Sequence, residues 1–254
     1  VIAKEGACLY GAMHEKVKNA LAWSILPYVP EAQSNPAIAE TILDSVNVPA
    51  TKIVESLEPD EVERLANAIS VPITGTYAIL PKKQGILRYA FEHALLLNVI
   101  GFKDKDMGLQ ALAASKATAV MKQSVQEHVT NLSKNLTTFC TLPRIESQNA
   151  IFVDVEGILP PSAWSDTASF ASVNNIFDPN KMLFLSGIEE ERIKFSVRCS
   201  PEFIASHGGE DVSTVIAHIR GNFDAAGGGH NLAGGLRISP SDFGRIKETI
   251  ENYF

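Results

Sequence analysis

The stretch GGGHNLAGG, from Gly227 to Gly235, is the most informative part of this 254-residue sequence. Glycine adopts positive φ angles and lets a backbone approach a ligand closely. Successive exposed backbone N–H groups form a concavity that binds anions, and a histidine at its mouth adds a donor or a positive charge. The stretch therefore predicts a phosphate-binding turn, and the alternative is a loop at a helix end with a capping histidine. The residues of the predicted turn are Gly227, Gly228, Gly229, His230 and Asn231.

A strand-like segment, RIKFSVRCS at 192–200, lies upstream of this motif and is separated from it by a helical pattern. This order of elements could bring Arg198 close to His230, and the planar guanidinium of arginine suits phosphate oxygens. Side chains alternate along a strand, so Ser196 and Arg198 share one face. We expect that face to be solvent-exposed, with Arg198, Ser196 and Lys194 as further phosphate-binding residues. The alternative for Arg198 is a solvated residue on the face of a sheet.

The remaining pattern predicts an α/β protein. Helical periods dominate residues 1 to about 70, and two longer helices are expected at 85–100 and 105–138. Beyond residue 150, short runs rich in Val, Ile and Phe alternate with helical segments, which is typical of a mixed β-sheet flanked by helices. The expected division is a helical linker at 1–75 and an α/β substrate-binding domain at 76–254.

Composition and motifs exclude several classes of function. The net charge of −7 lacks the overall basic character of many nucleic-acid-binding domains, so a nucleic-acid contact would be a local patch. The three cysteines have no metal-like spacing, and no membrane-length apolar run or signal peptide is present, which favours a cytoplasmic protein with no membrane partner. The sequence has no HxxxH or CxxC pattern, no GxSxG elbow and no GxGxxG fingerprint. Asp104 and Asp106 in KDKDMG resemble the start of a calcium-binding loop, but the remaining ligands are absent.

The segments IKFSVRCS and GGGHNLAGG together resemble the C-terminal DHH-associated domain of the DHH phosphoesterases, the superfamily that includes the RecJ nucleases. The family signature is a strand ending in S-x-R, followed by GGGHxxAAG, and Gly234 stands here where the family usually has alanine. Three helical stretches are similar to archaeal RecJ-like proteins, including the GINS-associated nuclease. They are LAWSILPYVPEAQSNPAIAETILDSVNV, LEPDEVERLANAI and ILRYAFEHALLLNVIGFKDKDMGLQALAAS.

The resemblance implies that this chain binds substrate for chemistry performed elsewhere. The family's manganese or magnesium ions are held by an N-terminal DHH domain, and no DHH triplet occurs here. The family's last catalytic aspartate is matched by YGAMHEKV, which offers His14 or Glu15 but no aspartate. We therefore expect a part of a longer protein that binds no metal or other cofactor, contains no catalytic residue and cannot hydrolyse nucleic acid alone.

Three functions stay open at this point. The first is the single-stranded DNA- or RNA-binding part of a RecJ-like exonuclease in DNA replication or repair. The second is a non-catalytic replication scaffold that binds GINS and helicase. The third is part of a phosphoesterase for small oligonucleotides or cyclic dinucleotides, which the helical segment 1–75 disfavours.

Overall fold

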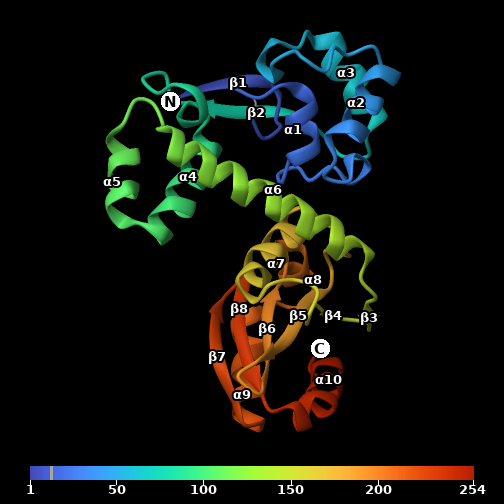
Figure 1. Cartoon of the computed structure of the whole chain (residues 1–254). Helices are drawn as coiled ribbons and strands as arrows, with labels where there is room; N and C mark the ends of the chain where they lie inside the picture. Colours follow the sequence, from blue (N-terminus) through green and yellow to red (C-terminus); the bar gives the residue numbers. More distant parts are fainter. Residues whose placement is uncertain (12–13) are drawn as a thin grey trace. The chain divides into compact units, whose positions relative to one another are not determined.

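The computed structural model describes residues 1–11 and 14–254, without the side chains of Phe102 and Lys103. It contains two compact units, Val1–Thr137 and Thr138–Phe254, which are coloured from blue to green and from yellow to red in Figure 1. The boundary therefore lies well beyond the division at 75/76 that was expected from the change of sequence pattern. Residues 74–79, on both sides of the expected division, pair with the first residues of the chain and so belong to the first unit.

The first unit contains a two-stranded antiparallel ribbon as well as helices. Strand β1 (Ile2–Ala7) pairs with β2 (Thr74–Ile79), with Gly6 opposite Gly75. The prediction that residues 1 to about 70 are all helical is therefore wrong at the start of the chain. The helices of this unit are α1 (Val17–Trp23), α2 (Pro36–Ser45), α3 (Pro59–Ala68), α4 (Ala90–Lys103), α5 (Lys105–Ala113) and α6 (Ala119–Thr141), the last of which continues into the second unit.

The prediction of a single helix at 105–138 is also wrong, because the structure has two separate helices, α5 and α6, in this region. Tertiary contacts end α5: the Lys83 ammonium donates to the carbonyl of Leu112 at 2.8 Å and to that of Ala114. The backbone N–H of Gln84 then donates to the Ser115 carbonyl at 2.8 Å. The carbonyls at the end of α5 and just after it therefore accept hydrogen bonds from another segment, which ends the helix there.

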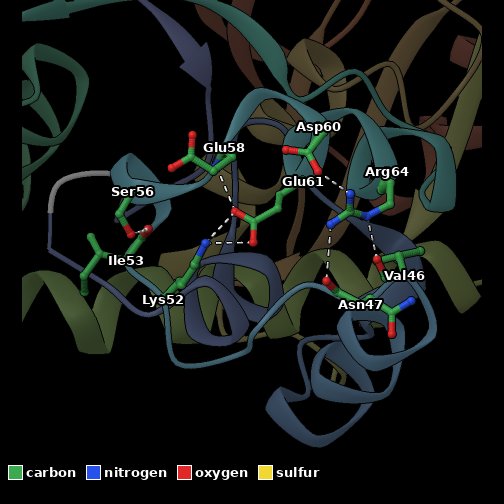
Figure 2. Close-up of polar contacts among 9 residues, drawn as sticks. All are labelled: Val46, Asn47, Lys52, Ile53, Ser56, Glu58, Asp60, Glu61 and Arg64. Carbon is green, nitrogen blue, oxygen red and sulfur yellow. Dashed lines mark hydrogen bonds and ion pairs between the residues drawn. The ribbon is translucent and has the colours of Figure 1, made fainter.

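A polar cluster fixes the start of α3 (Figure 2). The Lys52 ammonium donates to both carboxylate oxygens of Glu61 at 2.8 Å, and the Glu58 backbone N–H donates to the same carboxylate at 2.8 Å. One turn further on, Arg64 donates from Nε to the Val46 carbonyl at 2.9 Å. The cluster therefore joins α3 to the segments at 46–52, and the donors around Glu61 hold the pKa of this carboxyl below its ordinary value.

The substitution Glu61→Gln is expected to lower the free energy of unfolding by about 1–2 kcal/mol at neutral pH, because charge-assisted hydrogen bonds are lost. A carboxyl with a depressed pKa stabilises the fold above its unfolded-state pKa of about 4.3 and loses this effect as the pH falls through the folded-state value. The difference from the wild type should therefore shrink in urea titrations below about pH 4. Glu63→Gln, at an exposed position on the same helix, is the control. A difference that persisted undiminished in acid would contradict this account.

The second unit is built on a six-stranded mixed sheet, as the sequence predicted. The strand order is β3-β4-β5-β6-β8-β7, in which only β4 and β5 are parallel neighbours. The strands are β3 (Ile145–Glu146), β4 (Ala150–Asp154), β5 (Met182–Glu189), β6 (Arg192–Arg198), β7 (Ala225–His230) and β8 (Ala233–Ile238). The helices are α7 (Trp164–Val173), α8 (Pro201–Ser206), α9 (Val212–Asn222) and α10 (Phe243–Glu251).

Helices cover both faces of this sheet, and Figure 1 shows α7 and α10 beside it. Helix α7 packs on β5 and β6, where the Trp164 ring lies so close to Gly187 that a Cβ there would be 2.4 Å from a ring carbon. Helix α9 packs on β7 and β8, where a Cβ on Gly234 would be 2.5 Å from the Ile216 side chain. The buried cluster on the α9 and α10 face includes Phe152, Phe184, Phe195, Val197, Ile216, Leu236 and Ile246.

Candidate functional site

The glycine motif forms a β-hairpin, and the prediction of a phosphate-binding turn at the glycines is wrong in its geometry. Gly227, Gly228 and Gly229 lie within β7, at the edge of the sheet, and the chain reverses only after His230. In the register of the hairpin, Gly228 lies opposite Gly235. An extended strand alternates the directions of its N–H groups, so these glycines form no concave nest.

Close contact between β7 and β8 accounts for two of the three glycines. A Cβ on Gly227 would lie 2.2 Å from the carbonyl oxygen of Gly235, and a Cβ on Gly229 would lie 2.6 Å from that of Ala233. A Cβ on Gly228, in contrast, would have no atom within 4 Å. Gly227 and Gly229 are therefore needed for packing, whereas Gly228 leaves an open surface above the backbone.

The turn of the hairpin is fixed by the rest of the unit. The Asn231 carbonyl accepts hydrogen bonds from the Val212 backbone N–H at 3.1 Å and from the Cys199 thiol at 3.3 Å. The next carbonyl, that of Leu232, accepts from the Cys199 N–H at 3.1 Å. The end of β6 and the start of α9 thus hold the turn, and Asn231 acts through its backbone.

Strand pairing brings the S-x-R segment and the glycine motif onto one face of the sheet. Arg198 on β6 lies opposite Ala233 on β8, and Ala233 lies opposite His230 on β7. Ser196 lies opposite Gly235 in the same way. Adjacent strands are about 4.8 Å apart, so Arg198 and His230 are roughly 10 Å apart at the backbone.

Arg198 is buried, which corrects the expectation that Ser196 and Arg198 face solvent. Its exposed fraction is 8%, and that of Ser196 is 5%, because α7 covers this part of β6. The guanidinium donates to the hydroxyls of Ser165 at 2.9 Å and of Ser169 at 3.0 Å, both on α7. Burial lowers the pKa of Arg198, and nearby Asp166 opposes the shift.

Three carbonyl oxygens take the remaining donor positions of Arg198. They are those of Val197 at 2.7 Å, Ser165 at 3.1 Å and Gly234 at 3.3 Å. The side chain therefore ties α7 to β6 and β8, and it also lines a pocket of about 410 Å³ beside Leu232 and Ala233. Arg198 therefore acts as a positioning residue that holds the hairpin against α7.

Two neighbouring cations lie at one end of the open glycine surface and share one carboxylate. The Lys194 ammonium contacts Glu189 at 3.0 Å and lies 5.7 Å from the centre of the Trp164 ring. Arg237, opposite Lys194 in the β6–β8 register, contacts the other oxygen of Glu189. Arg237 and then Lys194 hold the pKa of Glu189 below its ordinary value.

Sequence reasoning missed Arg237. The available signal was its position two residues after Gly235, because period-2 alternation places both on one face of β8. The structure thus brings together a floor made of Gly228 and Gly235 and a rim that contains His230, Arg237 and Lys194. All of these except the half-buried Lys194 are exposed. A surface of bare backbone with cations beside it can accept a sugar–phosphate chain at close range.

The residues described here do not fit the metal pair that the resemblance implies. In the described ranges 1–11 and 14–254, no three His, Cys, Asp or Glu side chains gather as a metal site would require. Part of the matched segment, Ala12–Met13, lies outside the described residues. In the matched segment, His14 pairs with a carboxylate: its Nδ1 lies 3.1 Å from the buried carboxylate of Glu92. The other oxygen of Glu92 accepts from the Gly11 N–H at 2.7 Å.

The substitution Glu92→Gln is expected to lower the pKa of His14. Burial lowers the pKa of this imidazole, but the hydrogen bond and charge of Glu92, with a smaller contribution from Glu15, outweigh burial and the net shift is upward. A raised histidine pKa stabilises the fold below the unfolded-state value of about 6.5 and loses this effect as the pH rises through the folded-state value. An NMR titration of the His14 ring, with Glu15→Gln as the more distant control, measures the shift. An unchanged His14 pKa in Glu92→Gln would refute this coupling.

No described helix of the chain is long and apolar enough to cross a membrane. No protein-family model and no curated protein sequence match the chain. Among solved structures, CDC45 from Entamoeba histolytica aligns with 98% of this chain at a TM-score of 0.58 and 9% identity. This chain spans 57% of the length of that CDC45 chain.

Two other solved structures align less well. A DHH domain from a member of a family of ribosomal proteins has a TM-score of 0.42 and 12% identity, covering 88% of this chain and 50% of that one. The C-Ala domain of alanyl-tRNA synthetase from Aquifex aeolicus has a TM-score of 0.35 and 14% identity, covering 44% of this chain and 96% of that one. The likeness to CDC45 extends over both units, so the chain shares with that structure an α/β fold that includes a six-stranded mixed sheet flanked by helices.

Proposed function

We propose that this chain is the nucleic-acid-binding part of a RecJ-like protein and that the β7–β8 hairpin holds the backbone of a single strand. The observation that supports this most directly is the paired glycines Gly228 and Gly235, which leave bare backbone beside His230 and Arg237. Phosphate contacts of this kind position a strand without reading its sequence. Because the whole chain has a net charge of −7, the binding surface is confined to this local patch.

The residues of the patch have different roles in this proposal. His230 donates to a phosphate oxygen, and Arg237 and Lys194 supply positive charge. Gly228 and Gly235 allow close approach of the sugar–phosphate chain. Arg198 acts indirectly, since its donors are already used to hold α7 and the hairpin together.

A fluorescence anisotropy titration with a labelled single-stranded oligonucleotide at low salt tests the proposal. His230→Ala and Arg237→Gln should each weaken binding about fivefold to tenfold, the effect of about 1–1.4 kcal/mol per lost phosphate contact. Arg220→Gln, at an exposed position on α9, is the matched control and should bind like the wild type. An equal loss of affinity in all three variants would show that the oligonucleotide binds non-specifically. Unchanged affinity in all three would refute the proposal that the strand binds at the hairpin. DNA and RNA probes of equal length determine the preferred nucleic acid.

A second function is favoured by the shared fold with CDC45 over nearly the whole chain. In this alternative, the parent protein is a non-catalytic replication scaffold that binds GINS and helicase. A pull-down with purified GINS subunits, beside a manganese-dependent nuclease assay of a protein that contains the full parent chain, separates the two functions. Robust exonuclease activity of the parent would eliminate a purely structural role. Preferential activity on dinucleotides would instead favour a small-substrate phosphoesterase.

A further inference from the structure

An apolar groove of about 450 Å³ opens on the second unit's sheet, on the face that carries α10. The strand register places the apolar residues of the groove in two rows, each of which runs across neighbouring strands on this face. Ile145 lies opposite Phe152, and Ile188 lies opposite Ile193. Phe243, at the start of α10, closes one side and meets Phe152 edge-to-face with ring centres 6.2 Å apart.

Helix packing covers only part of each row. Phe184, the next residue after Phe152 in the first row, is fully buried. In contrast, the outer members Ile145 and Ile188 are 53% and 48% exposed. Large aliphatic side chains that border a groove and stay half exposed are typical of a surface that binds a partner.

Two carboxylates line the same groove. Asp154, on β4, and Glu156, just after it, are both exposed, and neither forms an ion pair with another described residue. One oxygen of Asp154 accepts from the Glu156 N–H at 3.0 Å, which leaves the other available. The Lys247 ammonium lies 5.5 Å from the centre of the Phe152 ring, which is part of the groove. The aromatic wall of the groove is thus already in contact with an ammonium group.

We propose that this groove binds an extended segment of a partner protein that carries aliphatic or aromatic anchors and a lysine or arginine. The apolar rows would receive the anchors, and Asp154 and Glu156 would pair with the basic side chain. The acidic rim repels a phosphodiester chain, so the groove does not compete for the nucleic acid of the proposed function. Asp154 and Ile188 lie on the sheet face opposite to Arg198 and Ser196, which makes the two surfaces separately testable.

The probes are two fluorescein-labelled libraries of eight-residue peptides, in which Leu, Ile, Val and Phe alternate either with Lys and Arg or with Asp and Glu. In anisotropy titrations with the 254-residue chain, the basic library should bind at least tenfold more tightly than the acidic one. Ile188→Thr should weaken binding of the basic library at least fivefold. Asp154→Asn combined with Glu156→Gln should reduce the preference for the basic library to twofold or less. Val173→Thr, which removes an exposed apolar residue outside the groove, is the control and should change nothing.

Three results would overturn the proposal. The first is no binding of either library, and the second is equal affinity of wild type and Ile188→Thr for the basic library. The third is a dimer in sedimentation equilibrium that Ile188→Thr dissociates, because the groove would then be covered by a second copy of the chain. All variants should keep wild-type affinity for single-stranded oligonucleotide, so failure here is distinguishable from failure of the proposed function.

Discussion

Gly227→Ala and Gly229→Ala are expected to destabilise the second unit strongly, whereas Gly228→Ala is expected to leave its stability unchanged. A methyl group at Gly227 or Gly229 would collide with the β8 backbone, at 2.2 and 2.6 Å from carbonyl oxygens. Backbone atoms held by strand pairing cannot move aside without loss of hydrogen bonds, so each substitution should cost roughly 3 kcal/mol. At Gly228 the methyl group has no atom within 4 Å.

Urea unfolding monitored by Trp164 measures these three effects. Trp164 packs on Gly187 in the second unit, and Trp23 lies in the first, so a Trp23→Phe background isolates the signal. We expect Gly227→Ala and Gly229→Ala to lower the free energy of unfolding and Gly228→Ala to leave it unchanged. Equal destabilisation by all three substitutions would show that glycine is required there for flexibility instead of for close packing of the strands.

Arg198→Met is expected to be the most damaging substitution of a charged residue in the second unit. The guanidinium satisfies two hydroxyls of α7 and the carbonyls of Val197 and Gly234. Methionine has similar length but no donors, so several buried acceptors lose their partners and the free energy of unfolding should fall by roughly 3–5 kcal/mol in total. Lysine should not rescue the loss, because a single ammonium cannot reproduce the planar arrangement of donors.

Arg192→Gln is the matched control for Arg198→Met. Arg192 lies at the other end of β6 and pairs with the exposed Asp224 at 2.6 Å. Exposed ion pairs contribute little, so this substitution should change stability by less than about 1 kcal/mol. Similar losses for the two arginines in urea unfolding, or full rescue by Arg198→Lys, would contradict the role assigned to Arg198.

The sequence predicted those parts of the fold that depend on local patterns. Runs of Val, Ile and Phe marked β4, β5 and β6, and the apolar period marked α9. Strand β1 was missed because its structure depends on pairing with β2, which lies far along the chain. Long-range pairing leaves no signal in a local window of sequence.

The sequence indicated which segments of the candidate site lie near each other but not the geometry of that site, and the binding roles of its residues stay predictions. The S-x-R segment and the glycine motif are neighbours in the sheet, as their order along the chain suggested. The conformation of Gly227–Gly229 could not be read from the sequence, because glycine is compatible with both a nest and a strand. The burial of Arg198 could not be predicted either, since it depends on where α7 packs.

The binding of single-stranded oligonucleotide by Gly228→Val tests the central claim most directly. Valine suits an exposed strand, and a Cβ at this position would have no atom within 4 Å, so the variant should unfold at the same urea concentration as the wild type or a higher one. Its side chain would nevertheless occupy the surface on which the sugar–phosphate chain is proposed to lie. We predict at least a tenfold loss of affinity with stability retained. Wild-type affinity in a stably folded Gly228→Val variant would contradict the claim that the hairpin holds the strand.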